Sequence, residues 1–205
     1  MSLFEKKAGG EKPATEEKKL TMQQALISDL RDVLFVLAIF MVVYMLLFRV
    51  VVVVGPSMYD TLVDGDRLVL LSNVVYNDPK QGDIIVASKE SFGGECIVKR
   101  VIATEGQTVD IDFSTGTVYV DGIALEEPYI SSQTTRPEGM LFPLTVEEDH
   151  VFVLGDNRND SKDSRDPSIG LVDEREILGK VIFLLSPGDH MGTVERDFSR
   201  IGWVD

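Results

Sequence analysis

Hydrophobic residues change their spacing once along this chain, close to residue 49. Residues 33–48, VLFVLAIFMVVYMLLF, are apolar and uncharged throughout. After that run, apolar and polar residues alternate in short segments that are separated by Gly, Pro, Asn and Asp. A long apolar run is typical of a membrane-spanning helix, whereas alternation at period two is typical of half-buried strands. The pattern therefore predicts one N-terminal transmembrane helix followed by a β-rich domain.

The apolar run is short for a complete membrane span. Its length as an α-helix is about 24 Å, whereas a hydrocarbon core is roughly 30 Å thick. Starting the span at Leu30 and letting Arg49 reach the headgroups closes this gap. We therefore expect a cytoplasmic tail over residues 1–29, a transmembrane anchor over residues 30–49 and an extracytoplasmic domain over residues 50–205. No A-x-A cleavage site follows the run, which favours a retained anchor over a cleaved signal peptide.

The remainder of the chain predicts strands and turns. A run of five valines, residues 50–54, suits a strand better than a helix because β-branched side chains lose rotamer freedom in helices. Residues 128–147 are rich in Pro, Ser, Thr and Glu and are expected to form a long loop. The expected strands cover residues 50–54, 67–71, 83–87, 96–102, 109–113, 117–120, 123–125, 151–154 and 181–185. The predicted fold class is mainly β, an antiparallel sheet domain behind a single helix.

Charge and composition exclude several function classes. The net charge is −14, and residues 1–32 are neutral overall, so the acidic excess lies in the rest of the chain. Nucleic-acid binding requires basic surface and is therefore not expected. A single cysteine, Cys96, excludes an internal disulfide. Two histidines, His150 and His190, leave little material for a metal site or a Ser-His-Asp triad. No metal or other cofactor is predicted.

Ser57 and Lys99 are the candidate nucleophile and base. Taken alone, a serine in a strand-ending turn most often bonds its own backbone. A lysine between two apolar residues on one strand face, as Lys99 is between Ile97 and Val101, is most often at the surface. Burial would instead lower the lysine pKa from about 10.4 toward 7 and let the neutral amine take a serine proton. Both interpretations are open at this point.

The order and spacing of several short motifs distinguish between these two interpretations of Ser57 and Lys99. The polar stretch 155–165 is not an EF-hand, because no Gly follows its acidic triplet and no Glu stands at the twelfth position. The motifs are Gly55-Pro56-Ser57-Met58 with Thr61-Leu62, Gly65-Asp66, Gly82-Asp83, Lys99-Arg100-Val101-Ile102 and Gly155-Asp156-Asn157-Arg158…Ser161…Asp163-Ser164-Arg165. In order and spacing they resemble the motif boxes of bacterial type I signal peptidases with one anchor. The resemblance covers roughly residues 30–186.

The resemblance implies a membrane-bound serine endopeptidase that removes signal peptides from secreted pre-proteins after a small-x-small site. Ser57 would be the nucleophile, Lys99 the general base and Ser161 the hydroxyl that orients the lysine amine. The other implied site residues are the ion pairs Asp156 with Arg100 and Asp163 with Arg165, and the substrate-pocket residues Met58, Leu62 and Val98. Secretory pre-proteins, membrane lipid and the secretion machinery are the implied partners. The implied location is the cell membrane, with one span and a cytoplasmic N-terminus.

Two positions depart from the family pattern. Asp60 stands where the family usually has Pro, and Gly55 stands where some members have a Ser whose hydroxyl helps to stabilise the oxyanion. We therefore expect the backbone N–H of Ser57 to be the main oxyanion donor.

Three other functions are weighed against this one. A conjugative-transfer maturation peptidase would use the same Ser-Lys chemistry. A self-cleaving SOS-repressor type is normally soluble and DNA-linked, which the anchor and the acidic charge oppose. A non-catalytic, membrane-anchored β-domain could bind extended peptides by strand addition, which the complete Ser, Lys and Ser set argues against.

Overall fold

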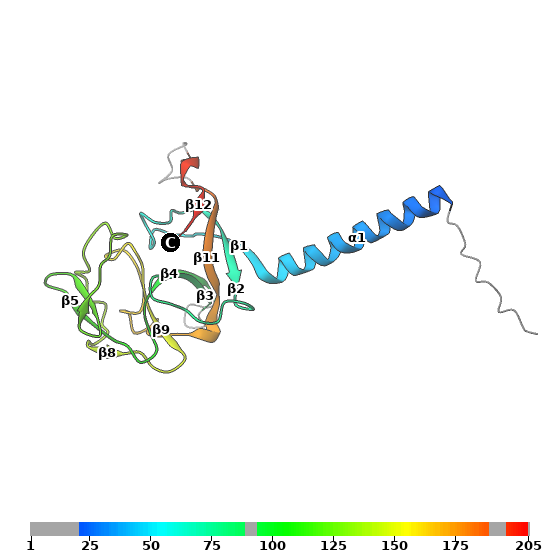
Figure 1. Cartoon of the computed structure of the whole chain (residues 1–205). Helices are drawn as coiled ribbons and strands as arrows, with labels where there is room; N and C mark the ends of the chain where they lie inside the picture. Colours follow the sequence, from blue (N-terminus) through cyan, green and yellow to red (C-terminus); the bar gives the residue numbers. More distant parts are fainter. Residues whose placement is uncertain (1–20, 89–93, 189–195, 205) are drawn as a thin grey trace, which may run out of the picture. The chain divides into compact units, whose positions relative to one another are not determined.

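The structure, a computed structural model, describes residues 21–88, 94–188 and 196–204 (Figure 1). The chain divides into two compact units, Met1–Val42 and Val43–Asp205. The division falls inside the one long helix of the described residues, α1 (Met22–Leu47).

Helix α1 is continuous and apolar. Thr21 and Gln24 form a reciprocal cap at its start, in which each backbone N–H donates to the other residue's side chain. No Gly or Pro interrupts the following residues, so the helix runs unbroken to Leu47. It is the one helix among the described residues that is long and apolar enough to cross a membrane. Its length is about 39 Å at 1.5 Å per residue, which exceeds a hydrocarbon core of about 30 Å.

The second unit is built from two antiparallel sheets. The larger sheet has the strand order β1-β2-β11-β3-β4-β9-β10, with β12 paired to β11, and the smaller has the order β7-β6-β5-β8. The strands are β1 (Phe48–Val52), β2 (Arg67–Ser72), β3 (Ile84–Ser88), β4 (Cys96–Thr104), β5 (Thr108–Asp112), β6 (Thr117–Val120), β7 (Ile123–Ala124), β8 (Leu144–Thr145), β9 (His150–Leu154), β10 (Val172–Asp173), β11 (Ile177–Ser186) and β12 (Gly202–Trp203). Two short 3₁₀ helices are η2 (Glu174–Glu176) and η4 (Phe198–Arg200). The predicted mainly β class behind one helix is confirmed.

Strand β1 begins and ends two residues earlier than the valine run predicts. It pairs with β2 from Phe48, opposite Leu71, to Val52, opposite Arg67. The helix therefore gives way to the sheet at Phe48 with no intervening linker. Phe48 and Arg49 join the strand because β2 provides paired residues opposite them, Leu71 and Leu70. The run of valines alone does not indicate this pairing. The last two valines belong instead to the turn that follows.

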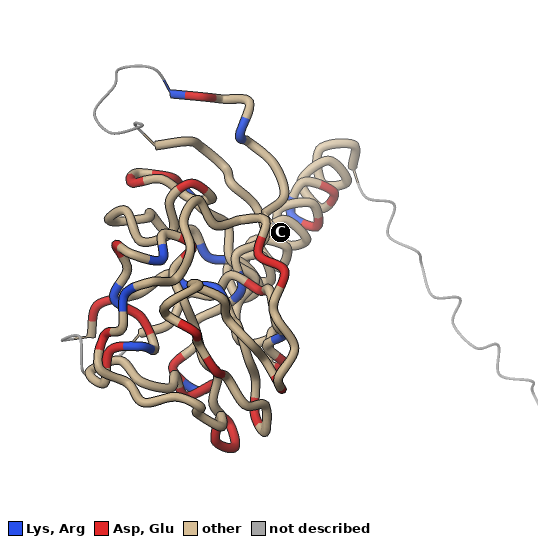
Figure 2. The backbone as a smooth tube through the Cα atoms, turned by 90° about the vertical axis from the view of Figure 1, so that its left-hand side faces the viewer, with Lys and Arg blue, Asp and Glu red and all other residues tan. Residues whose placement is uncertain are grey.

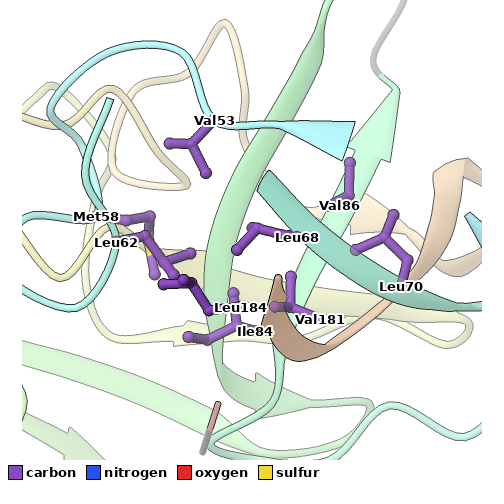
Figure 3. Packing of buried hydrophobic residues seen from close by; sticks show 9 residues of the cluster. All are labelled: Val53, Met58, Leu62, Leu68, Leu70, Ile84, Val86, Val181 and Leu184. Atoms are coloured by element: carbon purple, nitrogen blue, oxygen red, sulfur yellow. The ribbon is translucent and has the colours of Figure 1, made fainter. Parts of the chain in front are cut away.

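Three hydrophobic clusters fill the domain. One cluster, drawn in Figure 3, brings side chains of the turn after β1 against β2, β3 and β11. A second packs β3 and β4 against the segments around β9 and β10. A third joins the smaller sheet to β9, where the Phe142 and Phe152 rings meet edge to face at 5.9 Å. The turn after β1 is thus tied to the core on its apolar side.

Acidic residues and three of the arginines are placed differently in the domain. Acidic positions are spread over many separate loops of the domain rather than gathered in one patch (Figure 2). By contrast, three arginines, Arg100, Arg158 and Arg165, are at most 3 % exposed. A buried guanidinium is tolerated only when carboxylates and hydrogen bonds compensate its lost hydration. Arg158 and Arg165 lie in the loop that follows β9, and Arg100 pairs with that loop from β4.

Candidate active site

Ser57 lies in a hydrogen-bonded turn between β1 and β2, residues 56–62, which is called the serine turn below. Gly55 precedes it with a φ of +87°, a left-handed conformation that a side chain would strain. The Gly55 N–H donates to Asp64 Oδ1 at 2.7 Å, which closes the loop on itself. Further along, the N–H of Leu62 donates to the carbonyl of Met58 at 2.8 Å. The serine is therefore carried by a short, internally bonded segment.

Lys99 reaches this serine from the middle of β4. Its side chain is only 4 % exposed. Its Nζ lies 2.7 Å from Ser57 Oγ and 3.0 Å from the Val98 carbonyl oxygen. Burial lowers the pKa of Lys99 to about 8, against the opposing effect of the Asp163 and Asp156 carboxylates. Near that pH a large share of the amine is neutral and can accept a proton.

Gly155 opens the loop 155–165 directly after β9 and is enclosed on two sides. A Cβ atom added there would lie 2.1 Å from Ser161 Oγ and 2.4 Å from the Ser57 carbonyl oxygen. The absence of a side chain thus lets both serines approach the strand end. The Ser161 hydroxyl is buried and has no hydrogen-bond partner among the residues described. The expected bond between Ser161 and the Lys99 amine is not present in this structure.

Asp163 and Arg165 hold the loop from inside. Both side chains are fully buried, and Arg165 donates from Nε and Nη2 to the two Asp163 carboxylate oxygens at 2.8 Å each. Asp163 Oδ2 also accepts the Gly155 N–H at 3.0 Å. Arg165 Nη2 donates further to the Arg158 carbonyl at 2.6 Å. The pair therefore sets the path of the chain at both ends of the loop.

Arg100 and Asp156 connect the loop to β4 and to the serine turn. Arg100, the neighbour of Lys99, donates from Nε and Nη2 to the two Asp156 oxygens at 2.9 Å each. Asp156 Oδ2 also accepts the Thr61 hydroxyl at 2.6 Å. Because Thr61 lies four residues after Ser57, this carboxylate joins the strand with the lysine to the segment with the serine.

Glu127 and Tyr129 are contacts that the sequence does not reveal. Glu127 forms a buried ion pair with Arg158, and the Arg100 guanidinium lies 4.0 Å above the Tyr129 ring. Arg158 also donates to the Thr134 hydroxyl at 2.9 Å. The first part of residues 128–147, the segment expected to be a long loop, therefore packs over Arg100 and Arg158. Nothing in the local residue pattern distinguishes these positions, because their partners lie about thirty residues away.

Asn157, the neighbour of Asp156, holds the beginning of the serine turn. Its N–H donates to the Ser57 carbonyl and its side-chain amide donates to the Pro56 carbonyl, each at 3.1 Å. The sequence places Asn157 inside a motif without assigning it a role. The Ser57 N–H itself donates to no group among the described residues.

A cleft of about 460 Å³ opens beside Ser57 and Lys99. One wall is the chain from Val51 to Val54, and the other is the start of β4 from Cys96 to Val98. In the described part of the chain, β1 pairs only with β2, and β9 pairs with β4 only from Arg100 onward. Each wall therefore presents a strand edge with unpaired backbone groups. Val98, a predicted pocket residue, lines this cleft.

Met58 and Leu62, the other two predicted pocket residues, lie elsewhere. They are 1 % and 0 % exposed, and both belong to the core cluster beneath the turn (Figure 3). Neither is among the residues that line the cleft. The Leu62 N–H donates to the Met58 carbonyl, and both side chains pack inward into the core. Valines of the β1 wall line the cleft.

These groups have the requirements for acyl transfer. A hydroxyl lies within hydrogen-bond distance of a buried amine, an unbonded N–H is on the same serine, and a cleft with strand edges leads to both. Among the described residues, no group of three or more His, Cys, Asp or Glu side chains is placed to hold a metal ion. The site therefore fits a serine nucleophile with a lysine base.

Comparisons with known proteins give one consistent result. The family model described as signal peptidase, peptidase S26, matches residues 26–186. A signal peptidase I of Bacillus licheniformis is 32 % identical over 181 residues, which cover 84 % of this chain and 95 % of the relative. Signal peptidase I T of Bacillus subtilis (strain 168) is 37 % identical over 71 % of this chain and 77 % of its own length. A crystal structure of a signal peptidase I from Enterococcus faecalis V583 is 31 % identical, covering 50 % of this chain and 96 % of that one, with a TM-score of 0.42.

The packing around Gly155 predicts the effect of one added methyl group. We expect Gly155→Ala to reduce stability by about 1–3 kcal/mol, because its Cβ would overlap Ser161 and the Ser57 backbone. Gly202→Ala is the matched control, since no atom lies within 4 Å of a Cβ there. Thermal unfolding of the detergent-solubilised full chain measures both variants. A Gly155→Ala protein that melts together with the wild type would contradict the packing described.

Proposed function

This chain belongs to the signal peptidase family, peptidase S26, and acts as a serine endopeptidase that removes signal peptides; we propose that it does so with Ser57 as nucleophile and Lys99 as general base. The observation that carries the proposal is the 2.7 Å separation of Ser57 Oγ from the Nζ of a lysine that is 4 % exposed. At this separation the hydroxyl proton can pass directly to a neutral amine.

The reaction proceeds in two steps. Ser57 Oγ attacks the carbonyl carbon of the residue before the scissile bond, and its proton passes to the Lys99 Nζ. The tetrahedral intermediate collapses when the C–N bond breaks, and Lys99 returns the proton to the leaving amine. A water molecule then attacks the ester and gives a proton to Lys99, and Lys99 passes this proton to the leaving Ser57 Oγ as the ester C–O bond breaks and the new carboxyl terminus is released. Lys99 ends the cycle neutral, as it began.

Two further groups serve this cycle. The Ser57 N–H, which bonds to no group in the described residues, is the proposed donor to the oxyanion. The Ser161 hydroxyl, buried and without a partner there, is proposed to accept a hydrogen bond from Lys99 when the amine is charged. An unpaired buried hydroxyl costs free energy, and a charge-assisted bond during the reaction offsets that cost. Gly155 brings the hydroxyl close enough to the serine turn for this role.

The substrate is proposed to bind as an extended strand in the cleft. The edges of Val51–Val54 and of Cys96–Val98 offer backbone groups to a peptide that lies between them. The side chains along both walls are mainly valine and isoleucine, whose branched Cβ atoms stand close to the backbone. We propose that these walls favour small substrate side chains, as cleavage after a small-x-small sequence requires.

We propose that α1 anchors the protein in the cell membrane with its N-terminus in the cytoplasm and the β domain outside. Secretory pre-proteins present their cleavage sites at the outer surface of that membrane. Ser57 follows the end of α1 by ten residues, so the chain holds the hydroxyl within about 35 Å of the helix end. The signal segment of a substrate and the anchor would then share one bilayer.

The dyad is tested by removing each member. We expect Ser57→Ala and Lys99→Ala to lower kcat for a pre-protein in detergent by about a thousandfold or more, because each removes a group that acts in the transition state. Ser114→Ala and Lys80→Ala, which change an exposed serine and an exposed lysine, are the matched controls. Near-normal cleavage by either dyad variant would exclude that residue from the role assigned here.

The lowered Lys99 pKa predicts the pH dependence of cleavage. The base is active when neutral, so kcat/KM should rise with pH on an acidic limb centred near 8. The Glu138 carboxylate raises the pKa of Lys99. Glu138→Gln should therefore move the limb to lower pH, whereas Glu148→Gln at an exposed position should leave it in place. An activity that falls with rising pH across this range would contradict a lysine base.

Cys96 offers a chemical probe of the cleft. It is the only cysteine, it is exposed, and it lines the cleft wall on β4. We expect alkylation by N-ethylmaleimide to block cleavage, because the adduct occupies space that the substrate needs, and a peptide substrate to slow the alkylation. Cys96→Ser should cleave normally and be indifferent to the reagent. Unchanged activity after complete labelling would place the substrate outside this cleft.

A further inference from the structure

We propose that Arg200, near the C-terminus, is a positioning residue that fixes the turn carrying Ser57. The inference rests on the proposed role of Ser57 as nucleophile. Arg200 ends the short helix η4 and lies fourteen residues beyond the segment that matches the signal peptidase family model, which ends at residue 186. A residue outside the shared segment thus contributes to the geometry of the site.

Arg200 contacts Asp66, at the base of the loop between β1 and β2, and Thr61 in the serine turn. Its Nη1 and Nη2 donate to the two carboxylate oxygens of Asp66 at 3.1 and 2.7 Å. The same Nη2 donates to the Thr61 carbonyl at 3.1 Å. Thr61 lies near the end of the serine turn, four residues after Ser57. One planar guanidinium therefore joins the base of the loop to the end of the turn.

Asp66 makes this contact strong. Its side chain is fully buried and also accepts the N–H of Val63 at 2.8 Å and the N–H of Gly188 at 2.7 Å. The Asp66 carbonyl accepts the N–H of Val53, which closes the loop where β1 ends and β2 begins. A buried carboxylate without its cation would carry an uncompensated charge. Arg200, itself 21 % exposed, supplies that cation.

The Thr61 contact extends to the rest of the site. The Thr61 hydroxyl donates to Asp156, which is paired with Arg100, the neighbour of Lys99 on β4. Thr61 is therefore held through its carbonyl by Arg200 and through its hydroxyl by the loop after β9. A shift of this residue changes where Ser57 stands relative to the lysine amine, and misplacement by about 1 Å can cost about a hundredfold in rate.

Arg200 does not touch the substrate cleft. The cleft is lined by residues 51–54, 57, 86 and 95–99, and none of the residues that Arg200 contacts is among them. Loss of Arg200 should therefore change the chemical step more than substrate binding. This distinguishes a positioning role from a general contribution to folding.

The test uses the full chain in detergent with a pre-protein substrate. We expect Arg200→Ala to lower kcat by about ten- to a hundredfold with KM within about twofold of the wild type, and Arg200→Lys to retain part of the rate. Guanidinium ions added at millimolar concentration should restore activity to Arg200→Ala, because they can occupy the vacated site beside Asp66. Arg175→Ala is the matched control, because Arg175 forms a comparable fork with Asp173 at an exposed position. This variant should keep the wild-type kcat and should not respond to added guanidinium ions.

Ser57→Ala is assayed alongside to separate the two proposals. If Ser57→Ala is inactive while Arg200→Ala keeps the wild-type kcat, the inference about Arg200 is wrong and the nucleophile assignment stands. If Ser57→Ala remains active, the nucleophile assignment fails and this inference fails with it. A loss in Arg200→Ala that follows a lowered melting temperature and that guanidinium does not restore would assign the residue a purely structural role.

Discussion

The site depends on how three buried arginine charges are compensated. Removing a guanidinium from water costs several kcal/mol unless a carboxylate and further acceptors surround it. Each of the three has such a carboxylate: Asp156 faces Arg100, Glu127 faces Arg158, and Asp163 faces Arg165. Because these pairs are forked or further hydrogen-bonded, they allow little variation in the path of the loop 155–165. The loop in turn packs against the backbone of the serine turn.

Lys99 stands in contrast to these arginines. It is equally buried, yet its amine contacts a hydroxyl and a carbonyl in place of a carboxylate. Burial without a direct anionic partner disfavours the ammonium and lowers the pKa toward neutrality. The neighbouring carboxylates that would otherwise pair with the lysine are occupied by arginines. The same network that fixes the loop therefore leaves the amine available as a base.

Two separate parts of the chain, the loop 155–165 and the segment with Arg200, hold the serine turn. Asn157 binds its first carbonyl groups, Asp156 binds the Thr61 hydroxyl, and Arg200 binds the Thr61 carbonyl. Its apolar side packs into the core below (Figure 3). A small catalytic hydroxyl has few interactions of its own, so its position must be set by the segment that carries it. In packing, the C-terminal segment with Arg200 belongs to the same compact unit as the serine turn.

The sequence by itself determined the class of fold and indicated Ser57 and Lys99 as the candidate reactive pair. Alternation along a strand reports local burial directly, so every expected strand is present within a few residues. It did not predict the two-residue strands β8, β10 and β12, because two residues carry no period. Only the tertiary structure placed Met58 in the core and brought Arg200 to the serine turn. These outcomes depend on contacts between residues far apart in the chain, which a local pattern of apolar and polar residues does not encode.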